Sequence, residues 1–511
     1  MSKLKIADRL PKTVKLAAIS AFICGLVTHL YAIVNNLHCA DDIAQQPRGY
    51  GTGITSGRWF LSLLGDFMES IGGNYNLPLV NGILFILVLA IAAGFLVHTL
   101  HIQKKTSALW LGMLFVVFPT VTVTMLFRYT AVYNGLAVLF AVLAAWVLER
   151  SRYGLPLSAL FTALSLGIYQ AYVPITIGVF VLLLIRRAMQ EGTKVRDLVR
   201  KGLFYCAALV LGLLLYYLLL KLSLVLYGTA LSEYQGMNNM GKLSLSALPG
   251  LIKEAIAGVL FLPVRNYCGL SGMRTVKIAY LLMGGVSAVL LCYLLLTRVR
   301  RWGMAAMTGI LCLAFVVSVN FIVIMCPDAW IYTMMVYGFV MIPFFPMVLL
   351  ECLPEAPGWY AGFAGKLCVG ALVLLTLSYT YEANISYTTV YFANRQMENY
   401  CTSLVTQVRM TKDFTPEKTW AFIGKIDDPL LNCPWQYEIR YYAEFTDGLL
   451  NRPSMHEWIQ NYTGYLPPKL SEEECAALAK TPEVKSMPCW PSEGSIKVIG
   501  DTVVLKFEEL P

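Results

Sequence analysis

Two adjacent carboxylates, Asp41 and Asp42, are the side chains of this sequence best suited to acid–base chemistry. They lie a few residues beyond an apolar segment at about Val14–Val34 and are followed by the polar stretch Gln45–Tyr50. A carboxylate just beyond an apolar segment lies at the membrane surface, where it can take the proton of an acceptor hydroxyl as that oxygen attacks the anomeric carbon of a sugar. The alternative is a solvated loop, or a cap of the next helix. We predict that Asp41 and Asp42 are catalytic.

A sugar that leaves a phosphate needs cations to hold that phosphate. Four basic residues that we expect near the outer ends of apolar segments are predicted to bind it: Arg58, Arg128, Lys221 and Arg265. A guanidinium can hold a phosphate through two parallel hydrogen bonds. The alternative for each is an anchor whose charge reaches the membrane interface. We also predict that Tyr129, Tyr169 and Gln170, at a tight turn and at a helix break, contact the substrate.

The acidic pair could also serve a metal ion. Hard oxygen ligands would favour Mg²⁺ or Mn²⁺ at Asp41 and Asp42 if a divalent ion takes part, with one carboxylate as base and the other orienting the substrate or the ion. We favour a reaction without metal or other cofactor. The sequence contains no glycine-rich phosphate loop, nucleophile elbow or zinc spacing that would indicate another chemistry.

The elements that position these residues must lie in a membrane. Apolar residues make up 57% of the 511 residues and charged residues 14%, which excludes a soluble enzyme. The net charge of +9 reflects basic loops that set orientation and contact anionic lipid, and we expect no nucleic-acid partner. The sequence therefore predicts a mainly α-helical, polytopic transmembrane bundle.

About eleven spans are predicted, with the amino terminus in the cytoplasm because five basic residues lie before or at the start of the first span. The predicted cytoplasmic turns all carry Lys or Arg, and an odd number of spans leaves the carboxy-terminal tail outside. The candidate spans are about Val14–Val34, Leu77–Leu100, Ser107–Leu126, Thr130–Leu148, Pro156–Tyr169, Val173–Ile185, Leu203–Leu226, Val276–Thr297, Trp302–Met325, Ile331–Leu350 and Leu367–Glu382.

The segment Pro156–Ile185 allows two interpretations, one broken helix or two short ones. Both Arg150 and Arg186 favour the cytoplasm, so the number of crossings between them must be even. Two short helices or a re-entrant loop are therefore favoured.

Residues 1–395 are thus predicted to form the transmembrane region, with long external loops at 35–76 and 228–275. Each loop contains a segment with near-helical apolar period, Gly57–Met68 and Leu248–Leu262, which predicts a helix lying on the membrane. Residues 396–511 are predicted to form a small extracytoplasmic α/β domain, with strands at Thr419–Gly424 and Ser495–Gly500 and a capped helix at Ser471–Lys480.

Four of the thirteen cysteines lie in that polar tail, an even number that suits disulfides in an oxidising compartment. They are Cys401, Cys433, Cys475 and Cys489, and their pairing stays open.

In the order and membrane position of several short segments the chain resembles the glucosyltransferase II family of serotype-converting O-antigen glucosyltransferases, within the GT-C superfamily. The segments are Ala40-Asp41-Asp42-Ile43, Gly57-Arg58-Trp59, Gly167-Ile168-Tyr169-Gln170 and Glu382-Ala383-Asn384-Ile385. The likeness is one of pattern and spans nearly the whole chain.

The resemblance implies a GT-C-like fold in the cell membrane and transfer of a hexose, expected to be glucose, from a polyprenyl-phosphate-linked donor. The acceptor would be a cell-surface polysaccharide or its lipid-linked precursor, and an external-loop Asp would act as base with inversion. Two other functions stay open: a transporter or flippase of a lipid-linked glycan, and an O-antigen polymerase or ligase. The sequence shows no inverted repeat of segment lengths, which counts against the transporter. A polymerase or ligase would not need a carboxylate pair after the first span.

Overall fold

The structure of the protein is a computed structural model that describes residues 10–233, 244–299, 301–327, 329–354, 358–424 and 452–509. The chain divides into two compact units. Unit 1 comprises the chain up to Val34 together with Arg48–Asn384, and unit 2 comprises Asn35–Pro47 together with Ile385–Pro511. The acidic pair therefore folds with the end of the chain rather than with its sequence neighbours. The predicted boundary at residue 395 stays a prediction.

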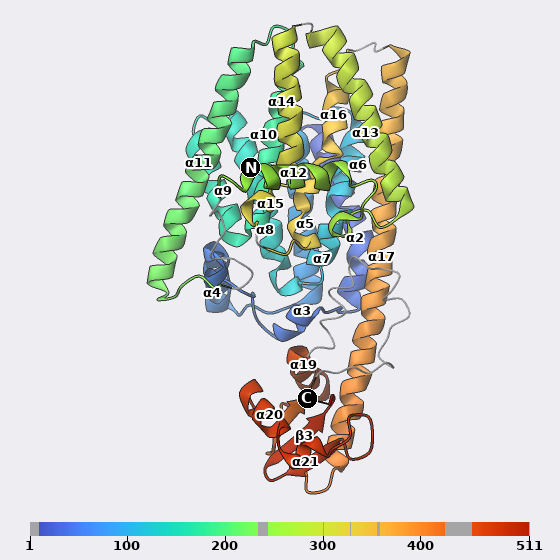
Figure 1. Cartoon of the computed structure of the whole chain (residues 1–511). Coiled ribbons are helices and arrows are strands. Elements are labelled where there is room, and N and C mark those ends of the chain that lie inside the picture. The colour runs from blue at the N-terminus through green and yellow to red at the C-terminus, as the bar shows by residue number, and fades with distance from the viewer. Residues whose placement is uncertain are drawn as a thin grey trace, which may run out of the picture. The chain divides into compact units, whose positions relative to one another are not determined.

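The elements of unit 1 in the part that the structure describes are helices joined by loops, which confirms the mainly α-helical class (Figure 1). Eight helices of the described chain are long and apolar enough to cross a membrane. Three shorter apolar helices, α6, α9 and the segment Tyr337–Glu351, occupy other predicted spans, and the number of eleven stays a prediction. The main helices are α2 (Lys12–Val34), α5 (Pro78–Thr99), α6 (Lys105–Val117), α7 (Pro119–Thr124), α8 (Arg128–Arg150), α9 (Gly154–Ile168), α10 (Val173–Ala188), α11 (Val195–Leu226), α13 (Arg274–Leu294), α14 (Trp302–Val319), α15 (Ile322–Met325), α16 (Phe344–Glu351) and α17 (Trp359–Met410).

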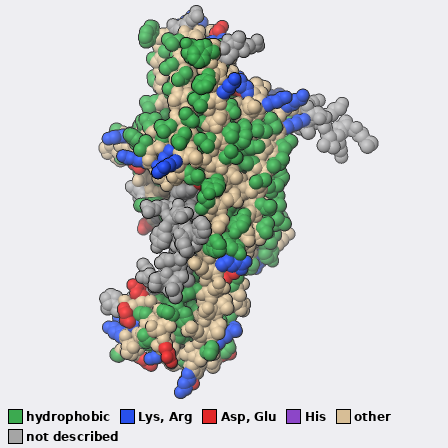
Figure 2. All heavy atoms as spheres, turned by 90° about the vertical axis from the view of Figure 1, so that its right-hand side faces the viewer, with side chains coloured by type: hydrophobic (Ala, Val, Ile, Leu, Met, Phe, Trp, Pro, Cys, Tyr) green, Lys and Arg blue, Asp and Glu red, His purple; other side chains and the backbone are tan. Residues whose placement is uncertain are grey.

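The surface of unit 1 suits a lipid environment. Large apolar side chains are exposed along its outer helices, for example Leu218, Leu222 and Val225 on α11. Figure 2 shows hydrophobic side chains spread over the helical part with Lys and Arg side chains at several places among them, and most of the acidic side chains in view lie in the part that contains α19 to α21. In water such apolar area would be costly, but in lipid it is the solvated surface. The protein is a membrane protein.

The predicted span at Ser107–Leu126 is broken into α6 and α7 by a proline. Pro119 has no N–H, so the carbonyl of Phe115 lacks the partner that an unbroken helix would supply. The hydroxyl of Tyr337 donates to that carbonyl instead, and the imidazole Nε2 of His29 lies 2.9 Å from the carbonyl of Val116. Side chains from other helices thus satisfy the backbone groups that the break leaves over.

The segment between Arg150 and Arg186 forms two helices, as the charge argument favoured. A 3₁₀ turn at Gln170–Tyr172 (η2) separates α9 from α10. Arg150 donates to the carbonyl of His98 at 3.2 Å, and Arg186 donates to that of His101 at 3.3 Å. Ion pairs near these residues join Lys201 with Glu149 at 2.7 Å and Arg298 with Glu191 at 2.6 Å. Helix α9 therefore begins and helix α10 therefore ends at the same end of unit 1, the end at which these basic residues lie.

The two long loops that are predicted to be external both contain the helices that the apolar period predicted. The helix α4 (Trp59–Ile71) buries Trp59 and Leu61, while Leu63, Phe67 and Ile71 are exposed at four-residue spacing. The helix α12 (Leu248–Leu260) packs on α14 and α15, and Figure 1 shows it running across the direction of α14. Helices with one apolar face free in a membrane protein suit the interface plane. The remaining short elements of unit 1 are η1 (Ile54–Ser56), η4 (Tyr267–Gly269), a π-helical turn at Leu295–Val299, η6 (Thr333–Met335) and η7 (Tyr337–Met341).

The last predicted span, Leu367–Glu382, is part of a much longer helix. The helix α17 has 52 residues and continues to Met410, well beyond the point where the sequence suggested an exit from the membrane. The reason is local, because no Gly or Pro occurs between residues 371 and 410. At about 1.5 Å per residue its length is on the order of 80 Å, far more than a bilayer requires.

Unit 2 contains the small sheet that the tail sequence predicted. Strands β1 (Thr419–Ile423), β2 (Ile496–Ile499) and β3 (Thr502–Lys506) lie in the order β1-β3-β2, with β1 parallel and β2 antiparallel to β3. Alternate residues cover opposite faces, so that Trp420 and Val503 join one apolar cluster and Ala421 and Val504 another. The helices of this unit beyond α17 are α3 (Ala40–Ala44), α19 (Arg452–Thr463), α20 (Glu472–Ala479) and α21 (Pro482–Lys485). Ser471 and Glu474 form the predicted capping box at α20.

The cysteines of the tail are reduced where the structure describes them. Cys401 and Cys475 are buried in separate apolar clusters and Cys489 is partly buried, all three as free thiols. Cys433 lies outside the described residues. The structure contains no disulfide among these three, and pairing that involves Cys433 stays a prediction.

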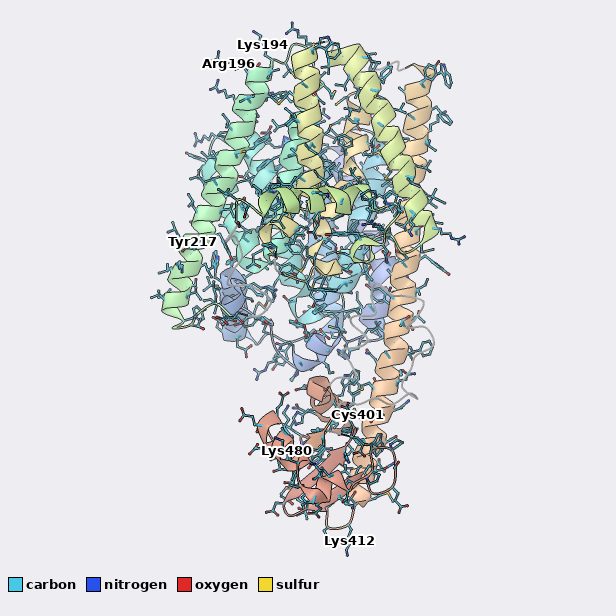
Figure 3. All side chains as sticks on the ribbon, in the orientation of Figure 1. Lys194, Arg196, Tyr217, Cys401, Lys412 and Lys480 are labelled. Atoms are coloured by element: carbon cyan, nitrogen blue, oxygen red, sulfur yellow. The ribbon has the colours of Figure 1, made fainter. Side chains whose placement is uncertain are left out.

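The orientation can be tested at two exposed lysines labelled in Figure 3, Lys194 before α11 and Lys480 after α20. We expect a membrane-impermeant maleimide to label Lys480→Cys in intact cells and Lys194→Cys only after permeabilisation, because the basic end should face the cytoplasm. Mass spectrometry of the labelled peptides distinguishes these sites from native cysteines. The reverse pattern would invert the predicted topology.

Candidate active site

The two carboxylates of the acidic pair have different surroundings in unit 2. Asp42 is completely buried, and its Oδ2 accepts a hydrogen bond of 2.7 Å from Nδ1 of His38, which is also buried. Asp41 is exposed on the short helix α3. A general base must come within hydrogen-bond reach of the acceptor hydroxyl. Of the two carboxylates, Asp41 is exposed to the surroundings and Asp42 is held by the fold.

In unit 1, two of the segments singled out in the sequence pack on each other. The Nε2 of Gln170 donates to the carbonyl of Ser56 at 3.0 Å and to the hydroxyl of Tyr216 at 3.2 Å. That hydroxyl in turn donates to the carbonyl of Gly57 at 3.1 Å. The break between α9 and α10 is thereby fastened to the loop that precedes α4.

Arg58 follows directly in this loop and lies over Tyr169. Its guanidinium carbon is 4.7 Å from the centre of the Tyr169 ring, and its Nε is buried with no hydrogen-bond partner among the described residues. Tyr169 itself packs edge-on against Tyr172. The aromatic ring orients the guanidinium through a cation–π contact and leaves hydrogen-bond donors of Arg58 for another group.

Arg128 and Tyr129 begin helix α8. Arg128 is completely buried, and its carbonyl accepts a hydrogen bond of 3.3 Å from Asn81. Tyr129 is partly buried and packs on Gly51, where a Cβ atom would come within 2.6 Å of the Tyr129 ring. The loop before α4 therefore contacts Tyr129 at Gly51 and Gln170 at Gly57.

Lys221 and Arg265 are not brought into this arrangement. Lys221 is exposed on α11, with its ammonium 5.5 Å from the ring of Tyr217, which is 54% exposed (Figure 3). Arg265 is exposed after α12 and lies over the ring of Phe261. Both side chains have the surroundings of interfacial anchors. Among the four predicted phosphate ligands, Arg58 contacts Tyr169, which is one of the predicted substrate residues.

Two residues of these arrangements were not assigned to the site from the sequence. Tyr216 is one of two adjacent tyrosines in a long apolar run, and its four-residue spacing from the buried Leu220 was the available signal. His38 stands four residues before Asp42, a helical spacing at which the two side chains can meet. Among the described residues, no three or more His, Cys, Asp or Glu side chains are grouped to hold a metal ion.

Comparison with known families decides the class of this protein. The family described as Glucos_trans_II, glucosyl transferase GtrII, matches residues 30–343, which is more than half of the chain. The chain belongs to this family. No curated protein and no solved structure matches it.

Membership in the GtrII family makes the chain a membrane glucosyltransferase by class, with a sugar donor and a glycan acceptor in general. The matched range contains Asp41, Asp42 and Arg58, together with the break at Gln170. It ends before α17, so most of unit 2 lies outside the matched range.

Gly57 offers a test of how the loop before α4 is built. Its φ of +77° lies in the left-handed region, and an added Cβ would come within 2.8 Å of both Gln170 Nε2 and Tyr216 Oη. We expect Gly57→Ala to destabilise unit 1 by about 1–2 kcal/mol from the backbone alone and to lower the melting temperature in detergent. Gly72→Ala, at a glycine with open space around it, is the matched control. Equal melting temperatures for both variants would contradict this role of Gly57.

Proposed function

We propose that this GtrII family member transfers glucose from a polyprenyl-phosphate-linked donor to a cell-surface polysaccharide or its lipid-linked precursor, with inversion at the anomeric carbon. The family supports glucosyl transfer and a membrane location. The observation that carries the finer proposal is the exposed Asp41 beside the buried, hydrogen-bonded Asp42.

In this mechanism Asp41 accepts the proton of an acceptor hydroxyl while that oxygen forms a bond to the anomeric carbon. The bond from the anomeric carbon to the phosphate oxygen breaks, and its electron pair leaves with the polyprenyl phosphate. Attack from the face opposite the phosphate inverts the anomeric configuration, through an oxocarbenium-like transition state. A single base is enough for this step because the phosphate needs no proton to leave.

The departing phosphate needs a positive partner. Arg58 supports this role because Tyr169 orients it and its Nε has no hydrogen-bond partner among the described residues. A planar guanidinium matches two phosphate oxygens, and its charge favours the phosphate most as negative charge develops there. Arg128, buried at the start of α8, is the second proposed ligand, and Tyr129 and Gln170 are the proposed substrate contacts.

The proposed lipid donor follows from orientation. If the end of unit 1 that carries Arg150 and Arg186 faces the cytoplasm, the end of α2 lies on the outer side of the membrane. Residues 35–47, which follow α2 and which we call the acidic segment, then lie outside as well. Nucleotide sugars are cytoplasmic, so a transferase with its base outside must take its sugar from a carrier in the membrane. We propose no resident metal ion or cofactor.

Substituting the two carboxylates singly tests the proposed base. We expect Asp41→Asn to lower the turnover number by at least about 100-fold with donor binding retained, because proton removal is lost while the phosphate ligands stay. Asp42→Asn should cost less, since the amide oxygen of this variant can still accept the hydrogen bond from Nδ1 of His38. The measurement is transfer from polyprenyl-phosphate-glucose in membranes, with and without a chelator.

Undiminished transfer in both variants would refute the assignment of the base. Loss of transfer with chelator alone would refute metal independence. Movement of intact lipid-linked sugar across vesicles without transfer would instead favour the transport function.

A second test separates Arg58 from the exposed cations. We expect Arg58→Gln to raise the KM for the donor about tenfold or more, because a charge-assisted contact to phosphate is lost. Lys221→Gln is the matched control and should change this KM by less than about twofold, as expected for an exposed anchor. Equal KM values in the two variants would speak against Arg58 as a phosphate ligand.

A further inference from the structure

His38 is held at its backbone by a side chain from a distant part of the chain. Its N–H donates to Oδ1 of Asn394 at 2.8 Å, and its carbonyl accepts from Nδ2 of the same Asn394 at 3.1 Å. Asn394 lies on α17 and is 4% exposed. One amide thus satisfies both backbone groups of His38, as a neighbouring strand would. Residue 38 cannot shift without breaking two buried hydrogen bonds.

The ring of His38 is held by helix α19. It meets Trp458 edge-on with ring centres 5.8 Å apart and Tyr462 with centres 6.4 Å apart. Trp458 is completely buried and stacks on Tyr462. The imidazole therefore has one orientation, in which Nδ1 points to the carboxylate of Asp42 at 2.7 Å.

Helix α3 is stable only with these contacts. A helix of five residues is unstable alone, because the free-energy cost of nucleating a helix exceeds the stabilisation from the hydrogen bonds of a single turn. Its Ile43 is 1% exposed and belongs to the apolar cluster that includes Met397, Cys401 and Trp458. The segment 35–47 is consequently a part of unit 2 in packing, although 337 residues separate it from the rest of that unit.

We infer that the carboxy-terminal part of the chain is a positioning element for catalysis. Asn394 and the aromatic face of α19 hold His38, His38 holds Asp42, and Asp42 holds α3 with Asp41 exposed. We name these five residues the acidic clamp: His38, Asp42, Asn394, Trp458 and Tyr462. His38 and Asn394 are thus positioning residues that act through Asp42. The inference rests on the proposed function for the role of Asp41.

The clamp can be tested with three variants and a matched control. His38→Leu removes the donor to Asp42, His38→Asn keeps a nitrogen donor near the position of Nδ1, and Asn394→Ala removes the backbone contacts. Asn399→Ala is the control, at an exposed Asn on the same helix α17. The full-length protein in membranes is assayed with polyprenyl-phosphate-glucose for turnover number and for the KM of the donor.

We expect His38→Leu and Asn394→Ala to lower the turnover number by about 100-fold, the effect of a misplacement of roughly 1 Å, with the donor KM unchanged. His38→Asn should recover part of the turnover, and Asn399→Ala should match the wild type. A role in stability alone would lower the amount of folded protein without this division between turnover and KM.

Cys39 supplies a readout that needs no activity. It is 1% exposed, and burial together with the charges of Asp42 and Asp41 raises the pKa of its thiol well above the ordinary value. A released segment 35–47 should expose Cys39 and favour its thiolate, so maleimide labelling quantified by peptide mass spectrometry should rise in His38→Leu and Asn394→Ala.

The outcomes separate the clamp from the proposed function. Unchanged Cys39 labelling in both variants, or raised labelling with full turnover, overturns the positioning role. If the wild-type protein transfers no glucose, the proposed function fails, and the labelling still decides whether Asn394 and His38 hold the acidic segment. Raised labelling together with lost turnover at constant donor KM supports the inference.

Discussion

Backbone groups that no helix satisfies must find partners inside the protein, and much of this structure depends on that constraint. In lipid no water is available to a carbonyl left over at a break. Where Pro119 interrupts a span, Tyr337 and His29 supply the hydrogen bonds. Where α9 gives way to α10, Gln170 and Tyr216 bond to the carbonyls of the loop before α4. Breaks in the apolar body therefore define where polar side chains gather.

The same physics gives the two neighbouring carboxylates different properties. A buried carboxylate is costly unless it is hydrogen-bonded, and His38 meets that requirement for Asp42. Asp41 is exposed and needs no such partner to be stable. An acidic pair in a sequence can thus be one buried, hydrogen-bonded group and one exposed group. The buried carboxylate fixes the helix on which the exposed one stands.

Much of the fold was predictable from the sequence, because lipid demands long apolar runs and charge sets their alternation. The hairpin of α9 and α10 followed from the parity of Arg150 and Arg186, and the capping box at Ser471 followed from local spacing. The strand at Thr502–Lys506 was missed, since one short apolar run beside a predicted strand resembles its continuation. The extension of α17 to Met410 was also missed, because polar residues there suggested an exit although nothing in the chain ends the helix.

The candidate site was predictable in residue types but not in partners. Periodicity reports which face of a helix is apolar, and it carries no information on contacts between residues hundreds of positions apart. The pairing of His38 with Asn394, across 356 residues, is such a contact, and so is that of Gln170 with Ser56. Lys221 and Arg58 were equivalent as cations in the sequence, and only their surroundings distinguish them.

The pairing of residue 38 with residue 394 also has a consequence for biosynthesis. The acidic segment, residues 35–47, is translated more than 350 residues before its partners on α17 and α19. At roughly 5–20 residues per second, that delay amounts to tens of seconds. During this time the helices of unit 1 can enter the membrane while the acidic segment still lacks the residues that bury it. The order of synthesis thus lets the acidic segment reach its final contacts only after the helices between residues 38 and 394 have been made.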